Sequence, residues 1–220
     1  MATGDWLFIW LGIAIAVVYE LHFRVGAQQA TLRLARATHA RLRAAWVLSL
    51  MQAGGQELLA VQTIRNSVLS ATVTASSAVL ALTAVVALAG GRPAAGTDAA
   101  ALGLTPAALL VALLVVVLCA TFAFSAMALR FFNHAGYLMT TQAEGETRER
   151  LAHMACNYMM RAGNYYSMGL RTLFWLAPVA VGLVNTRLVP LLALAIVAVL
   201  VWFDRTPEQL EGVLPGEGKP

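Results

Sequence analysis

The sequence predicts an all-α, polytopic membrane protein with four transmembrane helices, the last one kinked or broken, and two cytoplasmic helical connectors. Three observations carry this prediction. Hydrophobic residues make up 60% of the 220 residues and charged residues only 12%, against roughly 25% in soluble domains. Apolar runs of about 20 residues, the length that crosses a hydrocarbon core, recur along the chain. Arginines cluster between these runs, which is the positive-inside pattern.

The first three predicted spans are continuous apolar segments. The first runs from Trp6 to Phe23, and the acid before it, Asp5, favours an uncleaved span over a signal peptide. The second runs from about Ser67 to Ala89. The third, Thr105 to Leu129, opens with a capping threonine followed by proline in the first turn.

The fourth apolar region, Thr172 to Phe203, is too long for one upright span and short for two. Prolines and the polar break Asn185-Thr186-Arg187 interrupt it. In one reading, Leu173–Leu183 lies at the interface or re-enters, and Leu188–Phe203 then spans. In the other, a single tilted helix is kinked at proline. Two complete spans fit less well, because each would be shorter than the membrane.

Charges in the connectors set the predicted orientation. The connector 22–65 holds six arginines against one acid, and the connector 130–171 holds five arginines against three acids. The connector Gly90–Asp98 is short and neutral. Both long connectors are therefore expected in the cytoplasm, with the N-terminus external. The C-terminus is then external with four spans and cytoplasmic with five.

Both long connectors are expected to contain helices. Ala30–Gln52 lacks Pro and Gly and carries an apolar side, so it suits the headgroup level of a bilayer. Glu144–Arg161 is the second cytoplasmic helix. Residues 1–205 are predicted to form one transmembrane domain and 206–220 a disordered tail. The candidates for contact with anionic lipid headgroups are Arg33, Arg36, Arg41 and Arg43.

Polar side chains at helical spacing enter the second predicted span, where each one costs free energy. These candidates are Gln62, Arg65, Asn66, Ser70, Thr74 and Ser77. One reading is a pore lining whose cytoplasmic end favours anions. The other is helix packing, in which small residues allow close approach and hydroxyls bond across helices or back to their own carbonyls. The neighbouring alanines favour packing.

An acid closes the first predicted span. Glu20 lies one turn before Arg24, so an i, i+4 ion pair explains it, with a proton-relay carboxylate as the alternative. Arg65 and Arg130 fall at the same predicted level. Glu20, Arg24 and Arg130 are therefore assigned to a cytoplasmic mouth, in which Glu20 pairs with one or more of these arginines.

We expect no catalytic residues, no metal and no cofactor. His153 and Cys156 are soft ligands one turn apart, but a metal site needs three or four ligands. The sequence has no phosphate-binding loop, nucleophile elbow or zinc-protease motif. Its arginines follow the spans, which argues against a nucleic-acid partner.

Four runs carry a family resemblance: Arg43-Ala-Ala-Trp46, Leu59-Ala-Val-Gln-Thr-Ile-Arg-Asn-Ser67, Arg130-Phe-Phe-Asn-His134 and Thr172-Leu-Phe-Trp-Leu-Ala-Pro178. With them, the chain resembles the family catalogued as domain of unknown function 599 from about Trp6 to Arg205. The resemblance implies a multi-span protein, here of the bacterial inner (plasma) membrane, and brings no activity or cofactor. The sequence departs from the family pattern at Asn185-Thr186-Arg187, where such proteins stay apolar.

Two function classes stay open. The first is a small homo-oligomeric channel or transporter with an arginine-rich cytoplasmic mouth, because four spans are too few to enclose a path in one monomer. The second is a non-catalytic structural or accessory subunit that binds anionic lipid or another membrane complex. The expected partners are the lipid bilayer, anionic headgroups, and either further copies of the chain or a membrane complex.

Overall fold

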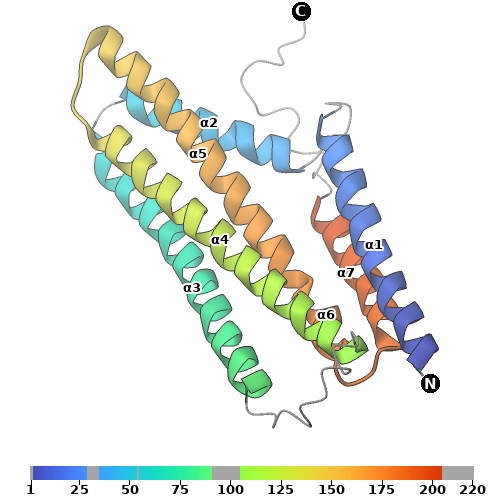
Figure 1. The fold of residues 1–220 in the computed structure, drawn as a ribbon. Helices are drawn as coiled ribbons and strands as arrows, with labels where there is room; N and C mark the ends of the chain where they lie inside the picture. Colours follow the sequence, from blue (N-terminus) through green and yellow to red (C-terminus); the bar gives the residue numbers. More distant parts are fainter. Residues whose placement is uncertain (1, 29–34, 54, 91–104, 205–220) are drawn as a thin grey trace, which may run out of the picture.

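The computed structural model is a bundle of long helices and describes residues 2–28, 35–53, 55–90 and 105–204 (Figure 1). No strand occurs within these ranges. The predicted tail, 206–220, lies outside them. The helices are α1 (Ala2–Gln28), α2 (Ala35–Ala53), α3 (Glu57–Gly90), α4 (Pro106–Thr140), α5 (Gly145–Phe174), α6 (Leu176–Gly182) and α7 (Leu188–Asp204).

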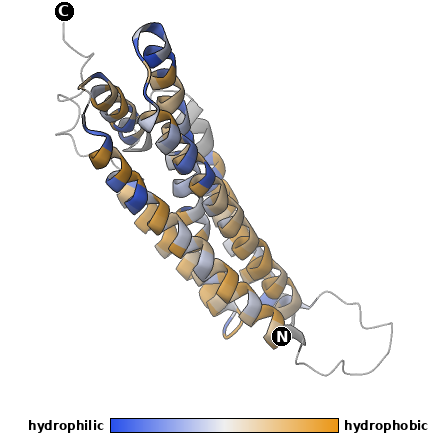
Figure 2. Ribbon diagram, turned by 90° about the vertical axis from the view of Figure 1, so that its left-hand side faces the viewer, coloured by the Kyte–Doolittle hydropathy of each residue, from blue (hydrophilic) through white to orange (hydrophobic). Residues whose placement is uncertain are grey.

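Three helices are long and apolar enough to cross a bilayer, and they indicate a membrane protein. They are Gly4–Phe23 within α1, Glu57–Leu88 within α3 and Pro106–Thr140, and they cover the first three predicted spans to within one residue, at Ala89 and at Thr105. Hydrophilic residues gather at the end of the bundle where α2 lies (Figure 2). The prediction of four such helices is not met in the described ranges, because α7 is apolar but has only 17 residues.

The start of α4 and its packing on α3 follow from local sequence. The Thr105 side chain accepts a hydrogen bond from the Ala108 amide at 3.1 Å and Pro106 follows it, so the predicted cap is confirmed. Ile64 of α3 contacts Gly136 near the other end of α4. Ala71 and Ala78 of α3 are buried, which lets the two antiparallel helices approach closely.

The second connector helix is longer than predicted, because α5 does not end near Arg161 but continues to Phe174. It runs antiparallel to α4: the Tyr165 ring stacks on Phe131 with centroids 5.4 Å apart, and Gly169 lies against Ser125. Its polar residues made it resemble a soluble connector. Its buried face consists largely of small residues, Ala152, Ala155, Ala162, Gly163 and Gly169. Gly169 allows a close approach to α4, whereas Gly163 faces Arg43 of α2.

The fourth apolar region forms a helical hairpin rather than one kinked helix. The chain passes from α5 into α6 at Trp175, and α6 carries Gly182 to Leu110 in the first turns of α4. The chain then turns at 183–187 and returns as α7. The polar break explains this turn: the Thr186 hydroxyl donates a 2.6 Å hydrogen bond to Asp5 at the start of α1.

The bundle has two parts, which contact each other near both ends of α7. The main buried cluster comes from α2, α3, α4 and α5, whereas α1 packs mainly on α7. The two parts join where Gly12 of α1 and Gly182 of α6 contact Val189 of α7. The helices α1 and α7 run parallel, since Asp5 pairs with Thr186 and Tyr19 with Asp204. At the other end of α7, near Asp204, polar contacts connect the two parts beside a cavity.

Candidate functional site

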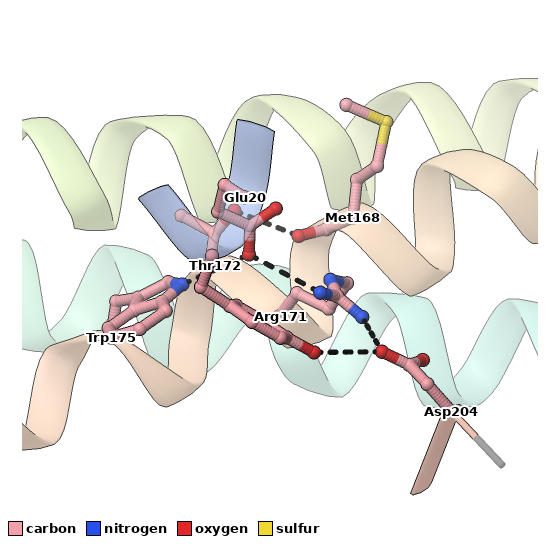
Figure 3. A network of polar contacts seen from close by, with 7 residues as sticks. Glu20, Met168, Arg171, Thr172, Trp175 and Asp204 are labelled. Atoms are coloured by element: carbon pink, nitrogen blue, oxygen red, sulfur yellow. Dashed lines mark hydrogen bonds and ion pairs between the residues drawn. The ribbon is translucent and has the colours of Figure 1, made fainter. Parts of the chain in front are cut away.

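A buried arginine joins the two parts of the bundle. Arg171 of α5 donates from Nη1 to Asp204 of α7 at 2.7 Å, and its Nη2 lies 3.5 Å from Glu20 of α1. The Tyr19 hydroxyl donates to the same Asp204 oxygen at 2.9 Å, and the Trp175 indole donates to Glu20 at 3.2 Å. Figure 3 shows the guanidinium between the two carboxylates. We call these five residues the Arg171 cluster.

The surroundings of Arg171 keep its guanidinium in place. The residue is only 7% exposed, and the carbon of its guanidinium lies 3.7 Å from the centroid of the Phe23 ring. A cation above an aromatic face is stabilised by the ring quadrupole. Nε has no hydrogen-bond partner among the described residues. The charge is therefore balanced by carboxylates from two other helices, and the ring fills the remaining side.

The Arg171 cluster lies well inside the apolar part of the bundle. Gly169 packs on Ser125, five residues inside Arg130 of α4, and Arg171 is two residues further along α5. At 1.5 Å of rise per residue, Arg171 is roughly 10 Å deeper than Arg130. Ionisable residues at such depth are costly and mark functional sites by default.

A large cavity borders the cluster. It has a volume of about 740 Å³, within the range of ligand pockets. Its walls come from α2, α3, α4, α5 and α7, and Arg171 and Asp204 lie at its deep end. We call it the α2 cavity, because His39, Leu42, Arg43 and Trp46 of α2 cover its other end. Most of the remaining lining is aliphatic or aromatic.

A smaller cavity lies on the other side of the same arginine. It measures about 360 Å³ and is lined by Glu20, Phe23, Phe124, Met168, Thr172, Trp175 and Arg171. Arg171 thus contributes to the walls of both cavities. Of its two carboxylate partners, Asp204 lines the α2 cavity and Glu20 the smaller one.

The residues proposed for a polar face on α3 do not line either cavity. Gln62, Arg65, Asn66, Ser70 and Ser77 are exposed on the outside of the bundle, and Thr74 is buried. Hydroxyls bond back to their own helix, Ser70 to the Asn66 carbonyl and Thr74 to the Ser70 carbonyl, both at 3.0 Å. The α3 residues that line the α2 cavity are instead Thr63, Ile64 and Ser67.

Glu20 forms an ion pair with Arg171, which the sequence had placed in the connector 130–171. Arg65 and Arg130 are exposed on α3 and α4, and Glu20 pairs with Arg171. The side chain of Arg24 lies outside the described residues. Of the described members of the assigned mouth, Glu20 lies in the buried cluster and Arg130 does not.

The headgroup candidates fall in different places. Arg33 and the side chain of Arg36 lie outside the described residues, and Arg41 is exposed. Arg43 points into the bundle and lines the α2 cavity. Its guanidinium crosses α5 at Gly163, where a Cβ would overlap it. Gly163 therefore leaves the space that Arg43 occupies.

The two weak metal candidates, His153 and Cys156, lie in different surroundings. His153 is exposed, whereas Cys156 is buried with its Sγ 3.5 Å from the Ala44 carbonyl of α2. Burial raises the pKa of the Cys156 thiol, which disfavours the thiolate that metals bind. The described ranges contain no group of three His, Cys, Asp or Glu placed to hold an ion.

The sequence reading missed Arg171, Asp204, Tyr19 and Trp175 as site residues. One signal was available: Arg171 and Asp204 stand at the two ends of the fourth apolar region. Opposite charges flanking a helical hairpin come together when its two arms lie side by side. The pairing of Arg171 with Asp204 can be predicted only if the chain is already taken to fold back as a hairpin. The sequence did not favour that arrangement.

The comparisons identify the family of this chain and nothing closer. No curated protein and no solved structure matches it. The family model described as "Protein of unknown function, DUF599" matches residues 7–209. Because this match spans nearly the whole sequence, the chain belongs to that family of proteins of unknown function.

Proposed function

We propose that this chain transports an organic anion across the bacterial inner membrane, along a path inside a single chain. The observation that carries the proposal is that Arg171 lines both cavities. We take its guanidinium as the partition between them. An anion that reaches the guanidinium competes with Asp204 or Glu20 for its donors. Replacement of a carboxylate by the anion on the guanidinium would open a connection between the two cavities.

The proposed path replaces a pore between subunits. The walls of the α2 cavity come from five helices of one chain, so we place the path within a single chain. Homo-oligomers are still proposed, with the exposed face of α3 as the contact. Transport then depends on the cavities, and assembly on α3.

Orientation is proposed from charge together with the helical hairpin. Arginine-rich segments lie at the end of the bundle that holds α2, which we assign to the cytoplasm. The hairpin arms α5–α6 and α7 add two passes to those of α1, α3 and α4. Five passes with an external N-terminus leave Asp204 on the cytoplasmic side.

This topology is tested by cysteine labelling in intact cells. In a chain without its two native cysteines, Asn185→Cys at the hairpin turn should react with an impermeant maleimide from outside. Gln142→Cys, exposed between α4 and α5, should react only after the membrane is permeabilised. Labelling of both from the same side would contradict the five-pass arrangement.

Transport is tested with two serine substitutions one turn apart on α3. Ser67 lines the α2 cavity, while Ser70 is exposed on the outer face. Uptake of radiolabelled acetate, benzoate and decanoate into proteoliposomes is compared for wild type, Ser67→Phe and Ser70→Phe. The path within one chain predicts that Ser67→Phe abolishes uptake and Ser70→Phe retains it.

The opposite pattern would favour a pore between subunits lined by the outer face of α3. If the wild-type protein transports none of the three anions faster than protein-free liposomes, the proposed function is overturned. Correct folding of each variant is checked by a single symmetric peak in size-exclusion chromatography.

A second candidate, the accessory subunit, is favoured by the first turns of α3. Leu58 is 72% exposed and Leu59 51%. Since Ile64 packs at Gly136, these leucines extend roughly 17 Å beyond the level of Arg130. Exposed apolar side chains outside the hydrocarbon indicate a protein contact.

The accessory role predicts a partner that depends on these leucines. Purification in mild detergent should retain a second protein with the wild-type chain and lose it with Leu58→Gln and Leu59→Gln combined. The matched change Leu80→Gln, on the same exposed face but within the apolar part of α3, should retain it. A homo-oligomer alone, dissociated by the paired change, would instead support self-assembly.

A further inference from the structure

We infer that an anionic phospholipid binds with its headgroup on the exposed face that α4 and α5 share, at Arg130 and Arg161. The residues of this face are Arg130, Phe131 and His134 of α4 and Tyr158 and Arg161 of α5, and we call them the α4–α5 patch. None of them lines the α2 cavity or the smaller cavity. The inference therefore does not rest on the proposed transport.

Ring contacts join the two helices within the patch. The guanidinium carbon of Arg161 lies 6.0 Å from the centroid of the Phe131 ring. The Tyr158 ring is centred 5.7 Å from Phe131 and 5.7 Å from His134. Arg130 stands one turn before His134, so both lie on the same side of α4. The rings of Phe131 and Tyr158 are partly buried, whereas Arg130, His134 and Arg161 are exposed.

The patch lies where α4 leaves the apolar part of the bundle. No charged residue occurs between Pro106 and Arg130, a distance of roughly 36 Å, against about 30 Å for the hydrocarbon core. Because Gly169 lies against Ser125 and the helices are antiparallel, Arg161 stands opposite residue 133, roughly 5 Å beyond Arg130. Both arginines are therefore at the headgroup level, where tyrosine is also enriched.

The patch carries positive charge without a nearby acid on its own helices. No Asp or Glu occurs in α4, and the last acid of α5, Glu149, is nine residues from Tyr158, or roughly 14 Å. Within the described ranges, neither Arg130 nor Arg161 forms an ion pair. A guanidinium binds phosphate oxygens through charge-assisted hydrogen bonds. Basic sites between membrane helices bind anionic headgroups for this reason.

The surface of α4 below the patch suits the acyl chains of such a lipid. Val116 and Ala123 are exposed and precede Arg130 by four turns and two turns, so they lie in line with it. A second copy fits this face less well. A two-fold contact through the patch would bring Arg130 and Arg161 against the same residues of the other copy, and like charges in an interface are costly.

The test determines which lipids stay bound to the full chain. The protein is released from nanodiscs made of equal parts phosphatidylglycerol and phosphatidylcholine, and the bound lipids are read by native mass spectrometry. Wild type should retain phosphatidylglycerol in preference. Arg130→Gln and Arg161→Gln should each lower the ratio of bound phosphatidylglycerol to phosphatidylcholine about fivefold, the effect of one arginine near an anionic headgroup.

Matched variants separate the site from overall charge. Arg150→Gln makes the same change in net charge at an exposed position of α5 that is already paired with Glu146, and it should keep the wild-type ratio. Phe131→Leu keeps every charge but removes the ring beside Arg161, so it should lower the ratio about threefold. Phe122→Leu, an exposed aromatic of α4 outside the patch, should leave the ratio unchanged.

Four outcomes would overturn the inference. The first two are a wild-type chain that retains both lipids equally, and Arg150→Gln that lowers the ratio as much as Arg161→Gln, which would show an effect of net charge only. The third is displacement of the lipid by excess glycerol 3-phosphate, which would indicate a site for soluble anions. The last is an acidic protein that copurifies with wild type and is lost with Arg130→Gln and Arg161→Gln while the lipid ratio stays unchanged.

Discussion

Replacing Arg171 by leucine should lower the free energy of unfolding by about 3–5 kcal/mol, the cost of leaving a buried charge without its partner. The substitution removes the guanidinium that joins α5 to α1 and α7. Asp204 and Glu20 then remain side by side without a cation. The expected result is a strongly lowered Tm in detergent, with the loss spread over both parts of the bundle.

A neutral version of the same cluster is the control. Combining Arg171→Leu with Glu20→Gln and Asp204→Asn removes all three charges, and it should recover a large part of the lost stability. The two carboxylates should also differ when changed alone. Asp204→Asn should cost more than Glu20→Gln, because Asp204 lies 2.7 Å from Arg171 and Glu20 3.5 Å. An unchanged Tm for Arg171→Leu would refute the joining role.

Replacing Gly12 by alanine should destabilise the protein by about 1–3 kcal/mol through overpacking. A Cβ at Gly12 would lie 2.5 Å from Cγ1 of Val189 on α7. The two helices run parallel there, and this contact sets how closely they approach. The Tm of Gly12→Ala, measured by intrinsic fluorescence in detergent, should fall accordingly.

The same helix supplies a matched control. Gly4 of α1 has nothing within 4 Å of an added Cβ, so Gly4→Ala should leave the Tm unchanged or slightly raised. Adding Val189→Ala to Gly12→Ala should restore part of the loss, because it removes the clashing methyl groups. Additive losses in the double variant would show that Gly12 and Val189 do not interact as described.

The sequence alone predicted much of the architecture, and for clear physical reasons. Long apolar runs with few charges have one stable arrangement in a bilayer, the helix, since every backbone group must be satisfied internally. This placed the first three spans, and the Thr105-Pro106 pair located the start of α4. The four quoted runs also led to the family, which the match over residues 7–209 confirms.

The sequence-based prediction was wrong at polar segments that pack against other helices. Hydropathy made 144–161 a separate connector helix, but α5 continues to Phe174, with Gly169 fitted against Ser125 of α4 and Gly163 leaving room for Arg43 of α2. The polar break at Asn185-Thr186-Arg187 is satisfied by Asp5, 181 residues away in the chain. Neither partner is visible from local composition.

The candidate site shows the same limit. The sequence singled out α3, whose hydroxyls bond within their own helix. It treated Arg171 as one charge of a connector, whereas the fold buries it between Glu20 and Asp204. Local periodicity and charge therefore determined that this is a helical membrane protein with an arginine-rich end. Only the tertiary structure decided which charges pair inside it, because ion pairing at depth depends on helices that are distant in sequence.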